Sequence, residues 1–246
     1  ESIGAHLVSD VPLSLFLSSG IDSNLIAHYS SKYHELNLFA QTLAVKSLTG
    51  GRFDESTLAS LTAEKLDMKI HIKTANVEYI EECFENVLGV MDQPSIDGLN
   101  VFMLSKELKQ HNLKVSLVGT GADEFLCGYN FYNTLPIISA IKSSKTFKAI
   151  SKNLNKKFSS KRLIKLFDAI LPYKDLLDSY ILQRSLNPPM TLVQDYDLNE
   201  IKYAYEYIRE HISEEIATSE LSKKHKLMYF DQKFYLKNQL LRDCDW

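Results

Sequence analysis

The feature that most constrains this fold is an apolar run that leads directly into a serine- and glycine-bearing turn and then a helix-like segment. Residues 12–17 form the apolar run, and residues 18–23 read Ser-Ser-Gly-Ile-Asp-Ser. A strand–turn–helix of this kind aims backbone N–H groups and a helix N-terminus at one point, as a phosphate requires. Ser18 and Ser23 add hydroxyl groups, and Gly20 permits close approach of the backbone. The pattern therefore predicts a phosphate-binding turn, with a serine-rich turn that binds nothing as the plainer alternative.

A second turn of the same kind follows about a hundred residues later. The run of residues 114–118 leads into Gly-Thr-Gly-Ala-Asp-Glu at residues 119–124. In a parallel sheet both turns would lie at the carboxyl ends of strands, where ligands bind. Asp22 and Asp123 could then share one nucleotide and its magnesium ion. The alternative is that each aspartate only caps the helix that follows it.

Strand-like and helix-like segments alternate through the first half of the chain, which favours a parallel sheet covered by helices. Beyond Tyr129 the strand signals fade and helical patterns dominate. The further strands are expected at residues 38–45, 69–73 and 115–118, and the helices at residues 55–66, 77–88 and 101–110.

Several segments in order along the chain resemble the synthetase domain of glutamine-dependent asparagine synthetases. The first turn resembles the Ser-Gly-Gly-x-Asp-Ser pyrophosphate loop of ATP pyrophosphatases, with Ser19 in place of the first glycine. The other matching segments are Ser9-Asp10-Val11-Pro12, Phe53-Asp54-Glu55, the stretch from Met91 to Asp97, the stretch from Gly119 to Tyr129, and residues 238–245.

The resemblance implies an α/β fold of the adenine nucleotide alpha-hydrolase type, with a parallel sheet flanked by helices and a mostly helical C-terminal part. Residues 1–135 would form the ATP-pyrophosphatase core. Residues 136–246 would form a helical extension of the synthetase domain that lacks the family's C-terminal portion.

The same resemblance assigns binding roles to individual residues. Asp22 and Asp123 are expected to bind Mg²⁺, whereas no catalytic residue is assigned. ATP is expected to contact Leu17, Ser18, Ser19, Gly20, Asp22, Ser23, Val45 and Gly119.

The implied reaction is ATP-dependent amidation of a carboxylate, aspartate to asparagine, through an acyl-adenylate with release of AMP and pyrophosphate. Ammonia would come from glutamine through an N-terminal glutaminase domain of the full-length chain. Thr120 stands where asparagine synthetases usually carry glutamate. This departure keeps two alternatives open, which are amidation of a sugar carboxylate in surface-polysaccharide synthesis and a non-catalytic nucleotide-binding regulatory protein.

Composition excludes some classes of partner. The formal net charge of −3 over 246 residues argues against a protein that coats nucleic acid. A lysine-rich segment at residues 139–167 is interpreted as the solvated face of an amphipathic helix rather than a tRNA-binding surface. The three cysteines have no metal-ligand spacing, and no run is long enough to span a membrane. The cysteine usage favours a cytoplasmic protein. A homodimer is a separate expectation.

Overall fold

The computed structural model describes residues 1–33, 38–45, 54–93, 95, 97–136, 176–184, 203, 206, 207, 210 and 220–245. The chain divides into two compact units. The first contains Glu1–Thr120 and Gln239–Trp246, and the second contains Gly121–Asn238. The domain limit expected at residue 135 stays a prediction. The lysine-rich segment at residues 139–167 lies outside the described residues.

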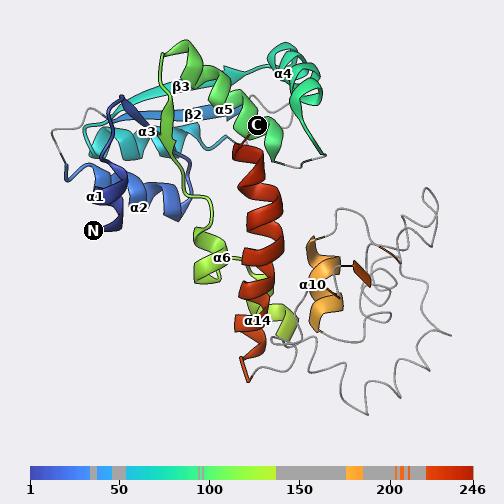
Figure 1. The fold of residues 1–246 in the computed structure, drawn as a ribbon. Helices are drawn as coiled ribbons and strands as arrows, with labels where there is room; N and C mark the ends of the chain where they lie inside the picture. Colours follow the sequence, from blue (N-terminus) through green and yellow to red (C-terminus); the bar gives the residue numbers. More distant parts are fainter. Residues whose placement is uncertain are drawn as a thin grey trace, which may run out of the picture. The chain divides into compact units, whose positions relative to one another are not determined.

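The first unit is built on a four-stranded parallel sheet (Figure 1). Its spatial order is β3-β2-β1-β4, so the two strands that precede the sequence turns are neighbours. The strand positions expected from the sequence are confirmed with small shifts at their ends. The strands are β1 (Leu13–Phe16), β2 (Phe39–Val45), β3 (Lys69–Ala75) and β4 (Val115–Leu117).

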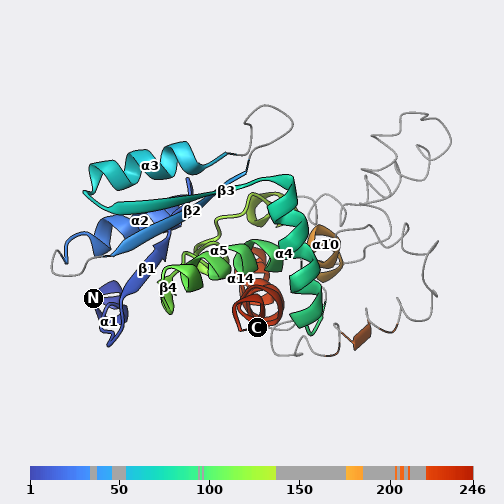
Figure 2. The same cartoon turned by 90° about the horizontal axis from the view of Figure 1, so that it is seen from above.

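Helices cover both faces of this sheet, as Figure 2 shows. The chain moves from β1 to β2 to β3 in one direction through α2 (Ile21–Ser30) and α3 (Ser56–Lys65), which lie on one face. It then returns to β4 through α4 (Val77–Val90) and α5 (Gly98–Gln110), and α5 lies on the other face. Right-handed crossovers produce this arrangement, because reversing the direction of travel reverses the face on which the helix packs.

The core of the first unit explains why β1 reads as a continuous apolar run. Leu13, Leu15 and Leu17 alternate along the chain on one face and are at most 5% exposed. Ser14, on the opposite face, is fully buried as well, since helices cover the sheet on both sides. Small residues of α3, Ala59 and Ala63, are fully buried in the same cluster as the leucines and let the helix approach the sheet closely. Each buried leucine contributes about 1.5–3 kcal/mol relative to an exposed one. A short helix, α1 (Ser2–His6), precedes the sheet and was not expected.

Most of the described residues of the second unit are helical, as expected for the C-terminal part. Their cluster of buried aromatic residues includes Phe131, Tyr132, Tyr180 and Phe230. A short 3-10 helix, η2 (Arg242–Cys244), belongs to the first unit. The helices of the second unit are α6 (Ala122–Leu126), residues 131–136, α10 (Leu176–Arg184), α14 (Lys223–Phe230) and most of the π-helical segment η1 (Asp231–Leu240).

A fully buried carboxylate, Asp231, organises this aromatic core. It accepts hydrogen bonds from Tyr132 and from Tyr180 at 2.7 Å, and two from Arg184 at 2.9 and 2.7 Å. Burial and the Asp231 charge raise the pKa of Tyr180 well above its usual range. Four donors on one carboxylate offset the cost of removing its charge from water.

Candidate functional site

The winding of the sheet reverses between β1 and β4. From β1 the chain winds one way to β2 and β3, and β4 lies on the other side of β1. Such a reversal of winding leaves an opening at the carboxyl ends of the two central strands, which is where open α/β sheets bind ligands. The loop of residues 17–20 and the loop of residues 118–120 both leave the sheet at this opening.

Gly119 brings these two loops into contact. A Cβ atom added at Gly119 would lie 3.1 Å from Cβ of Asp22 and 3.2 Å from the backbone N of Ser23. Both distances are below ordinary van der Waals contact, so a larger residue would push one of these neighbours away by a few tenths of an ångström. The loop after β4 therefore lies directly against the first turn of α2. That the two turns serve one ligand stays a prediction.

Serine side chains fix the shape of the first loop. The Ser18 N–H donates to Oγ of Ser23 at 3.1 Å, and the two hydroxyl oxygens lie 3.0 Å apart. The Gly20 N–H donates to Oγ of Ser18 at 3.1 Å. Asn24, on the next turn of α2, donates its side-chain amide to the carbonyl oxygens of Ser18 and Gly20 at 3.0 and 2.7 Å. The loop is thus held in a closed shape by its own polar groups.

Asp22 is not the helix cap that the plainer interpretation required. The N-cap of α2 is Gly20, and Asp22 is the second residue of the helix. N–H groups in the first turn of a helix have no carbonyl partner within it, and the helix dipole makes that end positive. This end of α2 combines glycine, hydroxyl groups and a half-buried carboxylate, which is a donor set suited to a phosphate and its cation.

Glu55 reaches the loop from another element, and sequence reasoning gave it no role. Its Oε2 accepts the Ser19 N–H at 3.1 Å, across 36 residues of sequence. The preceding Asp54 accepts hydrogen bonds from Oγ and N of Ser56 at 2.6 and 2.9 Å, which lower its pKa. These bonds fix the start of α3 beside the loop. The family-like Phe-Asp-Glu element was the available signal, although its phenylalanine lies outside the described residues.

Two more of the residues expected to contact ATP, Leu17 and Val45, lie toward the carboxyl ends of β1 and β2. Leu17 is 2% exposed and packs in the core, so it offers a ligand its backbone rather than its side chain. Its N–H donates to the Gln41 carbonyl of β2 at 2.9 Å. Val45 is the last residue of β2 and lies about 10 Å beyond the level of Leu17 along the sheet.

The motif of residues 119–129 continues into the second unit, where contacts between its own residues explain several of its positions. Gly121 has φ of +100°, a conformation that favours glycine. The buried Glu124 accepts the Tyr129 hydroxyl at 2.7 Å. A Cβ atom at Gly128 would coincide with the Asp123 carboxylate, so only glycine fits there.

Asp22 and Asp123 belong to different compact units. Asp123 is the second residue of α6, whose N-cap is Gly121, so it is not a helix cap either. Its expected partnership with Asp22 around one metal ion therefore stays a prediction.

Two further family-like segments meet within the first unit. The Ser95 hydroxyl donates to the carboxylate of Asp243, and Oγ of Ser95 accepts the Gly98 N–H at 2.9 Å. Arg242 pairs with Asp243 at 2.9 Å. The last residues of the chain thus pack on the loop before α5. Sequence reasoning matched both segments to the family without a structural role.

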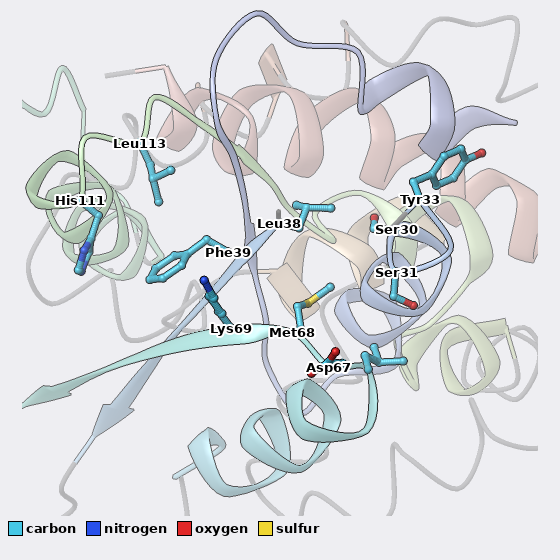
Figure 3. A pocket seen from close by; sticks show the side chains of 11 residues that line it. Ser30, Ser31, Tyr33, Leu38, Phe39, Asp67, Met68, Lys69, His111 and Leu113 are labelled. Carbon is cyan, nitrogen blue, oxygen red and sulfur yellow. The ribbon is translucent and has the colours of Figure 1, made fainter. Parts of the chain in front are cut away.

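A cavity of about 710 Å³ lies at the amino ends of the strands, beside the first residues of β2 and β3 (Figure 3). Its lining includes Ser30, Phe39, Lys69 and His111. The loop of residues 17–20 lies at the carboxyl ends of the strands, so this cavity is a separate feature.

Comparison with known proteins identifies the family. A family model described as Asparagine synthase matches residues 1–246. Asparagine synthetase [glutamine-hydrolyzing] 1 of Bacillus subtilis is 32% identical over 135 residues, which are 54% of this chain and 20% of that protein. Amidase chry2 of Gibberella zeae is 27% identical over 145 residues, which are 54% of this chain and 22% of that protein. The matched segment thus spans about a fifth of each relative.

An NH3-dependent NAD synthetase from Campylobacter jejuni aligns with a TM-score of 0.34 and 20% identity, over 52% of this chain and 56% of that one. This likeness is too distant to inform fold or function. Within the part of the chain that the structure describes, no helix combines the length and apolar character needed to cross a membrane.

Proposed function

The chain belongs to the asparagine synthase family, and we propose that it is the nucleotide-binding part of an ATP-dependent ligase that converts a carboxylate to an amide. The observation that carries this proposal is the contact of Gly119 with Asp22 and Ser23. It brings the loop after β4 against the first turn of α2, beside the loop after β1. The location and the donor groups suit the triphosphate of ATP.

In the proposed reaction, a substrate carboxylate oxygen attacks the α-phosphorus of ATP. The bond to the bridging oxygen breaks and pyrophosphate leaves. Ammonia then attacks the acyl carbon, AMP leaves with the bonding electron pair, the nitrogen releases one proton to water, and an amide remains. N–H groups at the start of α2 would stabilise the charge that builds on pyrophosphate, because they are already oriented before the reaction.

Asp22 fits a magnesium ligand in its chemistry, since it is a half-buried oxygen donor in the first turn of α2. A magnesium ion bound there would neutralise charge on the departing phosphates. We propose Asp123 as a second ligand on family resemblance. Glutamine as the ammonia source, a glutaminase domain in the full-length chain, a homodimeric state and a cytoplasmic location are part of the same proposal.

A second candidate substrate is a carboxylate other than aspartate, such as a uronic acid. Thr120 favours it, because threonine cannot act as a general base at neutral pH where a glutamate could. We therefore expect weak aspartate-dependent pyrophosphate release by the full-length protein. Thr120→Glu should increase it, while Thr120→Gln, which has the same length without the charge, should not.

The test of the proposed function is product analysis with the full-length protein, ATP, Mg²⁺, ammonia and a panel of carboxylates. We expect AMP and pyrophosphate in equal amounts, and an amide detected by mass spectrometry with one class of carboxylate. Formation of ADP and phosphate instead, or failure of every carboxylate to stimulate turnover, would contradict the proposed function. Efficient asparagine formation by the unmodified protein would contradict the role given to Thr120.

A further inference from the structure

Three side chains with metal-binding chemistry converge on the face of the sheet that α5 covers, away from the loop of residues 17–20. They are His71 of β3, Glu107 of α5 and His111, which follows α5. Their ligand atoms all lie within 4.8 Å of one another. Glu107 and His111 are four residues apart, so they lie on the same side of the end of α5. The fold thus brings together two imidazoles and a carboxylate from a strand and a helix.

We propose that His71, Glu107 and His111 bind a divalent transition metal ion, with zinc the best match. Two histidines and one glutamate are a ligand set that zinc uses where a fourth position stays open. Imidazole favours zinc and other late transition metals over Mg²⁺ and Ca²⁺, which prefer oxygen ligands. This site is independent of the proposed ATP chemistry.

The distance between His71 and Glu107 fits a shared metal better than a hydrogen bond. Nε2 of His71 lies 3.6 Å from Oε2 of Glu107, which is too long for a hydrogen bond. This nitrogen is buried and finds no hydrogen-bond partner among the described residues. Two ligands of a tetrahedral zinc ion, each about 2.0–2.1 Å from it, lie about 3.3 Å apart. A bound metal ion would give this nitrogen the partner that a buried polar atom requires.

The other oxygen of Glu107 is held in place by neighbours. Oε1 accepts the Tyr79 hydroxyl at 2.7 Å and pairs with Nζ of Lys73 at 3.0 Å. Burial alone would raise the pKa of Glu107, but the bonds from Tyr79 and Lys73 outweigh it and the net pKa is lowered. The carboxylate is therefore ionised at neutral pH. Outer partners of this kind orient a metal ligand and leave its second oxygen for the ion.

The fourth position would face the cavity of Figure 3. His111 is exposed and lines that cavity together with Phe39 and Lys69. The Phe39 ring lies 5.4 Å from the ring of His111 and 6.3 Å from that of His71, between centroids. Water or a small donor molecule could therefore complete the coordination from the cavity, as in open zinc sites.

The test is titration of the chelator-treated 246-residue chain with ZnCl2 by calorimetry. We expect one zinc ion per chain, and affinity at least about tenfold weaker in His111→Ala and in His71→Ala. His111 is exposed, so its variant tests the site even where His71→Ala fails to fold. His28→Ala, which removes an exposed histidine at the end of α2, is the matched control and should bind as the wild type does.

Two further readouts separate this site from other metal binding. Co²⁺ should give a visible spectrum without a thiolate charge-transfer band, because no cysteine belongs to the ligand set. Zinc should raise the thermal midpoint of the wild type and of His28→Ala but not of His111→Ala. Undetectable zinc binding, equal affinity in wild type and His111→Ala, or displacement of zinc by equimolar Mg²⁺ would overturn the proposal and leave an ion pair with a structural role only.

Discussion

Replacing Gly119 by alanine should weaken ATP binding, because this residue sets the closest approach of the two loops. The new Cβ would lie 3.1 Å from Cβ of Asp22 and 3.2 Å from N of Ser23. One neighbour is backbone in the first turn of α2, so relief requires the helix start to move by a few tenths of an ångström. Overpacking of this kind costs about 1–3 kcal/mol. If this cost destabilises the ATP complex relative to the free protein, ATP affinity falls about fivefold to 150-fold.

The assay is calorimetric titration of MgATP into the wild type and the variant, with circular dichroism to show that both are folded. Gly89→Ala is the matched control, because a Cβ at Gly89 meets nothing within 4 Å. Gly89 lies inside α4, where alanine should stabilise the helix by up to about 1 kcal/mol and leave ATP binding unchanged. Equal ATP affinity in a folded Gly119→Ala variant and the wild type would refute the reasoning.

Two further predictions concern stability. Arg184→Met should destabilise the second unit by about 3–5 kcal/mol in urea unfolding, since it leaves the fully buried Asp231 carboxylate without its guanidinium partner. Adding Asp231→Asn should recover part of the loss, and a cost below about 1 kcal/mol for Arg184→Met would contradict this account. The pKa of Glu107 in the folded protein lies below its ordinary value of 4.5. The ionised carboxylate therefore contributes fully to the free energy of unfolding above pH 4.5, and this contribution is lost as the pH falls through the folded pKa. Glu107→Gln should flatten the fall in stability over that acid range, and an unchanged pH profile would disprove the assignment.

The sheet could be predicted because its strands carry their own signals. Apolar runs predicted β1, β2 and β4, and the short segment of residues 69–73 predicted β3. The change from strand-like to helical patterns beyond Tyr129 predicted a mostly helical C-terminal part. The ends of the helices were predicted less accurately than the strands. α5 begins at Gly98, three residues earlier than expected, because the Ser95 hydroxyl accepts the Gly98 N–H. This bond depends on the three-dimensional position of Ser95, which no periodicity encodes.

The loops of the candidate site could also be located, but their contacts could not. Glycine and hydroxyl residues after apolar runs are local signals, and they led to Ser18, Gly20 and Gly119. The bond from Glu55 to the loop, and the meeting of His71 with Glu107, depend on strand order and on crossovers that bring distant residues together. Such pairs leave no mark in the local pattern.

Titration of ATP with and without Mg²⁺ shows whether the carboxyl ends of β1 and β4 bind ATP through Mg²⁺ held by Asp22. Asp67→Asn is the matched control, because Asp67 lines the cavity at the amino ends of the strands and asparagine tolerates its φ of 50°. The account predicts magnesium-dependent binding in the wild type and in Asp67→Asn, and at least about tenfold weaker binding in Asp22→Asn. Equal affinity in all three proteins, or binding that is indifferent to Mg²⁺, would contradict it.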